Sequence, residues 1–150
     1  MIIESSFAVN APQQRVWDFL VDPTQMVGCV PGCSNVEQVG DNRYRATMST
    51  KVAYITFSAA TEVSITRMDP PRELESVARG EDKRLGSNVQ IAATLRLTPQ
   101  PDGATEVAYR ADVSLWGKLG SLGEPIFRQK ATQMGREFAQ CVKGKLEARP

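Results

Sequence analysis

The chemistry open to this chain is narrowed by an absence, because its 150 residues include no histidine. Histidine is the usual general base, the usual activator of Ser and Cys nucleophiles, and the commonest metal ligand. A catalytic site would therefore have to use Asp, Glu, Lys, Tyr or Cys. No Gly-rich phosphate loop and no Ser- or Cys-based triad can be assembled from the sequence.

The cysteines are the next candidates for chemistry, and they are Cys29, Cys33 and Cys141. Cys29 and Cys33 flank a Pro-Gly pair but lack the second ligand pair of a zinc site, so we interpret this segment as a structural turn. Cys141 follows an apolar helical pattern, and we expect a buried free thiol there. An odd number of cysteines does not indicate a disulfide framework and is typical of a reducing compartment.

Polar side chains in the central part of the chain divide between two faces of predicted strands. The carboxylates alternate with apolar residues, which predicts that they are solvated surface groups: Glu62, Glu75, Glu106 and Asp112. A few hydroxyl-bearing residues fall on the apolar face instead: Tyr44, Thr61, Ser76 and Tyr109. These hydroxyls could orient a ligand carbonyl or hydroxyl, or could be satisfied core groups, and the sequence leaves both readings open.

The elements that position these residues follow from periodicity. The N-terminal part predicts a strand over 2–10, helices over 13–21 and 23–27, and a turn over 29–33. Alternation then predicts strands at about 34–39, 43–52, 55–67, 73–80, 87–98 and 105–116. A helical stripe runs from about Lys118 to the C-terminus. We therefore expect one α+β domain over 1–150, in which a curved antiparallel sheet of about seven strands grips a long C-terminal helix.

The inner face of this sheet is rich in small residues, which lie opposite Ala131, Met134 and Gly135 of the last helix. Small residues between a sheet and a helix permit either close packing or a void. A strongly curved sheet cannot close everywhere on a straight helix, which favours a void, and apolar voids of useful size are usually binding sites. We predict ligand contacts at Tyr44, Met48, Phe57, Ala78, Ile91, Tyr109, Phe127, Ala131 and Met134. We predict a cavity mouth at Met26, Cys29 and Pro31, and no catalytic or metal-binding residue.

Composition limits the partners. The formal net charge of +1 gives no field that would attract nucleic acid. The N-terminus lacks the features of a signal peptide and no apolar run is long enough to span a bilayer, so we expect a cytoplasmic protein, at most peripheral at the inner membrane face. The last helix has a basic polar side: Arg128, Lys130, Arg136, Lys143, Lys145 and Arg149. This side is either a solvated face or a contact surface for an anionic membrane or an acidic partner.

Several motifs resemble a known family. Residues 7–12 (FAVNAP) and 16–20 (VWDFL) resemble the opening of START-like, SRPBCC helix-grip proteins, the superfamily with the Bet v-like fold. Residues 26–33 (MVGCVPGC), 79–82 (RGED) and 117–123 (GKLGSLG) narrow the resemblance to the carbon monoxide dehydrogenase CoxG family. The similarity covers nearly the whole chain.

The resemblance implies a non-catalytic accessory protein associated with molybdenum hydroxylases such as carbon monoxide dehydrogenase. It implies a hydrophobic small molecule, lipid- or quinone-like, in the grip cavity, and no other cofactor. The chain ends at Pro150 without a hydrophobic anchor, so we expect at most transient membrane contact. The alternatives are an enzyme of the same fold, cyclase- or hydrolase-like, acting on a hydrophobic substrate, and a protein used purely for docking or assembly. Formation of a homodimer is also left open.

Overall fold

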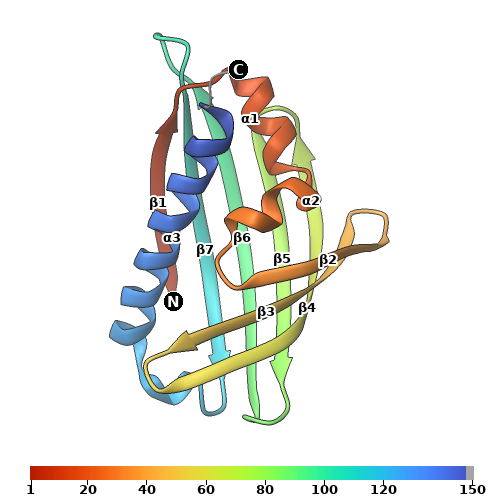
Figure 1. Cartoon of the computed structure of the whole chain (residues 1–150), viewed down its shortest axis with the longest axis vertical. Coiled ribbons are helices and arrows are strands. Elements are labelled where there is room, and N and C mark those ends of the chain that lie inside the picture. Colours follow the sequence, from red (N-terminus) through yellow and green to blue (C-terminus); the bar gives the residue numbers. More distant parts are fainter. Residues whose placement is uncertain (148–150) are drawn as a thin grey trace.

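The fold is a single curved antiparallel sheet with helices inside the curve and along one side (Figure 1). The computed structural model describes residues 1–147. Its strands are β1 (Ile2–Val9), β2 (Cys33–Gly40), β3 (Arg43–Val52), β4 (Ile55–Asp69), β5 (Glu73–Asp82), β6 (Ser87–Pro99) and β7 (Thr105–Trp116). Their order in the sheet is β1-β7-β6-β5-β4-β3-β2, so the meander predicted from the alternation is confirmed, with β1 joined to its last strand.

The helical segments are α1 (Gln13–Leu20), α2 (Pro23–Met26), the 3-10 turns η1 (Val27–Cys29) and η2 (Gly120–Leu122), and α3 (Glu124–Leu146). The predicted start of the last helix near Lys118 is wrong. Gly117 and Gly123 adopt φ values of +78° and +92°, which end β7 and delay α3 until Glu124. Of the basic residues expected on this helix, Arg149 lies outside the described residues.

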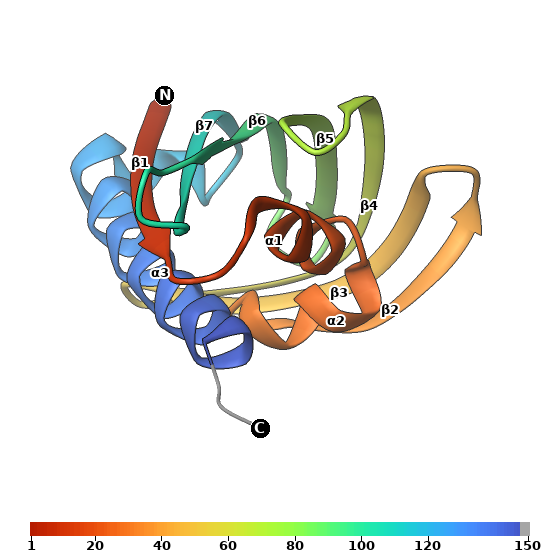
Figure 2. The same cartoon turned by 90° about the horizontal axis from the view of Figure 1, so that it is seen from above.

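A core cluster fixes α1 inside the curve of the sheet (Figure 2). The buried side of α1 consists of Val16, Trp17, Phe19 and Leu20. They pack with strand residues and with the end of α3, in a cluster that includes Val9, Leu97, Val107, Val142 and Leu146. The rings of Phe7 and Phe138, 6.0 Å apart and edge to face, join β1 to α3. The long helix therefore lies on the β1 side of the molecule.

A second cluster occupies the opposite end of the sheet. It contains Val52 and Ile55 on either side of the β3–β4 turn, together with Phe57, Ala59 and Leu119. Leu119 is held in place by its own backbone, because its N–H donates a hydrogen bond of 2.9 Å to the buried Ser87 hydroxyl. The loop between β7 and α3 is thus anchored on the β5–β6 turn.

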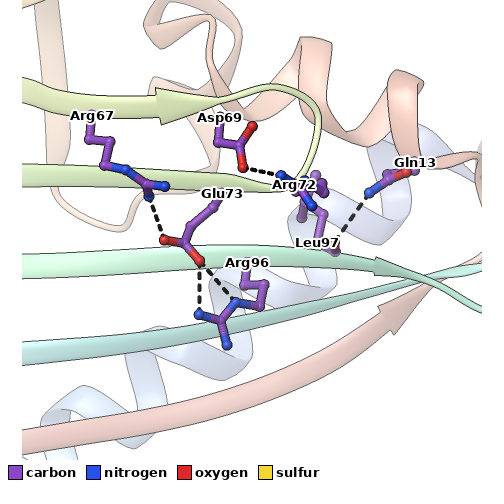
Figure 3. A network of polar contacts seen from close by, with 7 residues as sticks. All are labelled: Gln13, Arg67, Asp69, Arg72, Glu73, Arg96 and Leu97. Atoms are coloured by element: carbon purple, nitrogen blue, oxygen red, sulfur yellow. Dashed lines mark hydrogen bonds and ion pairs between the residues drawn. The ribbon is translucent and has the colours of Figure 1, made fainter.

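A polar network ties α1 and three strands together (Figure 3). Glu73 accepts hydrogen bonds from Arg96 at 2.8 and 3.0 Å and from Arg67 at 2.6 Å, which links β4, β5 and β6 on the outer face. The bonds from Arg96, and then those from Arg67, lower the pKa of Glu73 below its ordinary value. Gln13 donates to the Leu97 carbonyl at 3.2 Å, which attaches the start of α1 to β6.

Candidate functional site

An apolar cavity of about 320 Å³ lies between the inner face of the sheet and the segment that runs from α1 through η1 into β2. Strands β3 to β6 supply one wall: Tyr44, Ala46, Met48, Phe57, Thr61, Val63, Ile65, Leu74, Ser76, Ala78, Gly80, Val89 and Ile91. The segment from α1 to β2 supplies the other: Leu20, Val21, Pro23, Met26, Val27, Val30, Cys33 and Val36. The cavity thus lies beside α1 and α2, and its described lining includes no residue of α3.

The lining is suited to binding and poor in reactive groups. Within residues 1–147, the lining contains no Asp, Glu, Lys or Arg. Burial raises the pKa of the Cys33 thiol, which keeps it protonated and weakly nucleophilic at neutral pH. The carboxylates of Glu62 and Asp112 lie on exposed positions of β4 and β7. The described cavity wall therefore has no charged side chain that could act as a general acid or base.

Three hydroxyl-bearing residues supply polarity to the sheet wall, and each comes from a different strand. Thr61 on β4 is paired in register with Gly80 on β5. A Cβ at Gly80 would lie 2.9 Å from the Thr61 hydroxyl oxygen, so glycine keeps the space beside this hydroxyl open. Tyr44 on β3 pairs with Val63, and Ser76 on β5 pairs with Ile65, which places them farther along the same wall.

The opposite wall is fixed by hydrogen bonds within its own segment and by one to β3. The Asp22 carboxylate caps α2 by accepting the Thr24 N–H at 3.1 Å, and its hydrogen bonds to the side chains of Thr24 and Gln25 lower its pKa. The Gly32 carbonyl accepts a hydrogen bond of 2.8 Å from the N–H of Ser49 on β3. Gly32 has a φ of +80°, and a Cβ there would collide with the Ser49 carbonyl oxygen, so this turn requires glycine.

A disulfide between Cys29 and Cys141 joins this wall to α3. The prediction of a free thiol at Cys141 is therefore wrong, because two of the three cysteines form one bridge; Cys33 is the free cysteine. The apolar stripe of α3 does not face the sheet alone, because the end of α3 also meets η1. There the two Cα atoms are 5.3 Å apart, although the cysteines are 112 residues apart in sequence. The cysteine count therefore gives no support for a reducing compartment.

The predicted contact residues divide into two groups. Those that line the cavity are Tyr44, Met48, Phe57, Ala78 and Ile91, together with Met26 of the predicted mouth. Those that lie outside its lining are Tyr109, Phe127, Ala131 and Met134, together with Cys29 and Pro31 of the mouth. Ligand contact at any of these residues stays a prediction, whereas the position of the void does not match the one expected opposite Ala131–Gly135.

On the α3 side, the sheet and the helix are in close contact at Gly135. A Cβ at Gly135 would lie 2.5 Å from the Tyr109 hydroxyl oxygen, so the glycine accommodates this side chain and brings sheet and helix together. Phe127 packs against the cluster around Leu119. Small residues therefore have two uses in this fold: at Gly135 they allow contact, and at Ala78 and Gly80 they leave space.

The wall formed by α1 to β2 is the part that the sequence prediction missed. Its members include Leu20, Val27, Val30 and Val36. The available signal was the concentration of apolar residues in a segment of short helices and turns, since such residues need a partner surface. The sequence does not reveal the curvature of the sheet, so that partner surface could not be identified from it.

The sheet order, the two short helices after β1 and the long C-terminal helix define a START-like protein of the helix-grip type. A conserved protein from Geobacillus kaustophilus has a similar structure, with a TM-score of 0.89 and 21% identity over 98% of this chain and 95% of that one. A START superfamily protein from Mycobacterium smegmatis gives a TM-score of 0.71 with 12% identity over 97% of both chains. The family model for CoxG, which is named as a subunit of carbon monoxide dehydrogenase, matches residues 5–147, and the chain belongs to this family.

One further comparison concerns an enzyme of the same fold. The Zhui aromatase/cyclase from Streptomyces sp. R1128 shares the fold, with a TM-score of 0.72 and 16% identity over 98% of this chain and 93% of that one. Comparison with curated proteins finds no match.

In the described part of the chain, no helix combines the length and apolarity needed to cross a bilayer. Residues 1–147 also contain no cluster of His, Cys, Asp and Glu that could hold a metal ion.

Proposed function

We propose that this protein is a non-catalytic carrier that holds one hydrophobic small molecule, lipid- or quinone-like, in the cavity between α1–η1 and strands β3–β6. The observation that carries the proposal is the lining, which is apolar apart from a few hydroxyls and a thiol and lacks charged groups among the described residues. Natural ligand sites are roughly 300–1,000 Å³, so a cavity of about 320 Å³ suits one ring system or a short apolar group.

The hydroxyls make the ligand class more specific. Burial of apolar ligand surface contributes roughly 25 cal/mol per Å². A carbonyl oxygen buried without a hydrogen bond costs about 1–3 kcal/mol, so a lining without donors would reject it. The hydroxyls of Tyr44, Thr61 and Ser76 could donate to such an oxygen. A molecule with an apolar body and one or two acceptor oxygens, as in a quinone, therefore satisfies this wall better than a pure hydrocarbon does.

The family name supports an accessory role beside a molybdenum hydroxylase such as carbon monoxide dehydrogenase. In this role the protein would bring its ligand to the enzyme or take it away, with no chemistry of its own. The absence of an acid or base at the described cavity wall supports a carrier. The aromatase/cyclase relatives in fold favour an enzyme as the second candidate, which would need a carboxylate turned into the cavity.

A ligand test distinguishes these functions. Purified protein is extracted with organic solvent, the extract is analysed by mass spectrometry, and the stripped protein is titrated with a short-chain naphthoquinone. The matched variants are Ala78→Leu in the cavity wall and Ala92→Leu at an exposed position of the neighbouring strand β6. Leu adds three carbon atoms, which displace ligand contacts worth about 0.8 kcal/mol each.

We expect Ala78→Leu to weaken quinone binding by at least about tenfold, and Ala92→Leu to leave it unchanged. Equal affinity in both variants would place the ligand elsewhere. An extract without any lipid or quinone, together with no binding on titration, would end the carrier proposal. Turnover of a hydrophobic substrate by the purified protein would favour the enzyme.

A further inference from the structure

We propose that the Cys29–Cys141 disulfide is a redox gate for the cavity, whose reduction by a dithiol loosens one cavity wall and weakens ligand binding. The part that loosens is residues 22–32, which we call the gate segment. It supplies four of the eight residues of the wall opposite the sheet: Pro23, Met26, Val27 and Val30. The proposal rests on the carrier function proposed above and adds a regulation of the same site.

The gate segment is fixed in the core by one side chain. Cys29 is 3% exposed, whereas every other residue from 22 to 32 is half-buried or exposed. Helix α2 contributes no buried residue, and Cys29 is the buried residue of η1. Since burial of apolar surface is the dominant stabilising contribution to a fold, this segment is held in place chiefly at Cys29.

The partner of Cys29 lies on an element that is fixed independently of the disulfide. Cys141 is followed by the fully buried Val142, which packs with Leu146 in the core cluster shared with α1, β1, β6 and β7. Figure 2 shows the end of α3 beside the segment that follows α2, where the disulfide joins them. Reduction therefore leaves α3 in place and releases the gate segment.

Hydrogen bonds do little to replace this anchor. The Asp22 carboxylate accepts from Thr24 and Gln25, which lie within the gate segment itself. In residues 1–147, the hydrogen bond from this segment to the sheet is the one of 2.8 Å between the Ser49 N–H and the Gly32 carbonyl, at the far end of the segment. Without the disulfide, the stretch between α1 and Gly32 loses its attachment to α3.

The reduction is a thiol–disulfide exchange with a dithiol. Cys141 is only partly buried, so a thiolate of the dithiol attacks its sulfur, and Cys29 leaves as a thiolate and takes up a proton. The second thiol of the reductant then displaces Cys141 from the mixed disulfide, and Cys141 is protonated in turn. Two electrons and two protons pass in total, which convert the protein disulfide into two thiols and the dithiol into a disulfide.

The ligand and the disulfide must influence each other equally. If reduction weakens binding by a given factor, bound ligand makes the disulfide harder to reduce by the same factor, because the two equilibria are linked. A tenfold coupling corresponds to a shift of about 30 mV in the reduction potential of the disulfide. The loaded protein therefore resists reduction better than the empty one.

Binding of a redox-inert probe tests the gate, since a quinone would itself oxidise thiols. The probe is dimethoxynaphthalene, the methylated form of a naphthohydroquinone, which has an apolar ring system and two acceptor oxygens. It is titrated by fluorescence into the oxidised wild type, the wild type reduced with dithiothreitol, and Cys29→Ala/Cys141→Ala. We expect the affinity of the last two to be at least about tenfold weaker than that of the first, with no effect of dithiothreitol on the double variant.

The matched control is Gly117→Ala, which destabilises the opposite end of the molecule, where Gly117 packs on the Gly86 carbonyl. This variant should bind the probe as the wild type does, because it lowers stability without loosening the gate segment. Amide hydrogen exchange gives a second readout that needs no ligand. Reduction should speed exchange in the gate segment at least about tenfold, at times when the amides of β4–β6 are still protected.

The outcomes separate this proposal from the carrier function. Equal affinity of the oxidised and reduced proteins would overturn the redox gate and leave the carrier. Exchange of the gate segment only together with β4–β6, or an equal loss of affinity in Gly117→Ala, would also overturn the gate, because the disulfide would then stabilise the whole fold rather than the wall. No binding of the probe in any form would overturn the carrier and with it this regulation.

Discussion

Removal of the Cys29–Cys141 disulfide is expected to produce a large loss of stability. The disulfide joins residues 112 apart, and restriction of the unfolded chain over such a separation corresponds to about 4.8 kcal/mol in the chain-entropy model. Measured values are commonly lower, so we expect a loss of about 2–5 kcal/mol in the free energy of unfolding. This exceeds the effect of most single substitutions.

The assay is urea denaturation of the same protein with and without reductant, followed by fluorescence. The double variant Cys29→Ala/Cys141→Ala should match the reduced wild type and be insensitive to reductant. Cys33→Ala is the control, because Cys33 is free, and this variant should keep the full response to reductant. In denaturant without reductant, thiol titration should count one group per chain.

Two results would refute this reasoning. The first is the titration of three thiols in the unreduced protein, which would mean that the disulfide does not form. The second is a difference below about 1 kcal/mol between oxidised and reduced protein, which would mean that the bridge constrains the unfolded chain far less than its span requires.

Three further predictions concern backbone conformation and pH. Gly117→Ala should destabilise the protein by more than Gly103→Ala does in thermal melts. Both glycines have a positive φ, +78° and +88°, so an alanine at either position incurs about 1 kcal/mol of strain, but only Gly117 also faces a backbone carbonyl. Equal losses in the two variants would contradict the close packing of Gly117 on Gly86. Ala53→Gly should raise the free energy of unfolding, measured in urea, by about 0.5–1 kcal/mol, because Ala53 has a φ of +54° that glycine adopts without strain. A destabilised variant would argue against this turn geometry. Glu73→Gln should lower stability at neutral pH, and the difference in stability from the wild type should disappear in acid. The pKa of Glu73 is lowered in the folded protein, so its contribution to stability is present above its ordinary pKa and is lost as the pH falls through the folded value. Parallel urea midpoints for these two proteins from neutral pH to about pH 3 would contradict the role of the Arg67–Glu73–Arg96 contacts.

The strands were predictable because each has one buried face, which imposes a period of two on the sequence. The ends of the elements were less predictable where side chains act on distant backbone. β5 continues past Gly80 to Asp82, whose carboxylate accepts the Ser58 N–H at 2.9 Å and the Leu85 N–H at 3.2 Å. Nothing in the local sequence identifies Ser58 as the partner.

The candidate site was predictable on its sheet wall and not on its other wall. Inward residues such as Met48 and Ala78 follow from alternation alone. The position of the void depends on where the sheet curves away from the helices. The alternation of apolar and polar residues does not encode this curvature, so the void was expected under α3 rather than beside α1. The contact of Cys29 with Cys141 depends on the same arrangement, since it requires η1 and the end of α3 to meet.

The disulfide also gives the chain the topology of a ring with two tails. Every strand from β2 to β7 lies within the ring closed by Cys29 and Cys141. A single proteolytic cut in any turn between these cysteines would therefore leave one covalent molecule, whose fragments separate only after reduction. The exposed β3–β4 and β5–β6 turns could thus be nicked without release of either cavity wall.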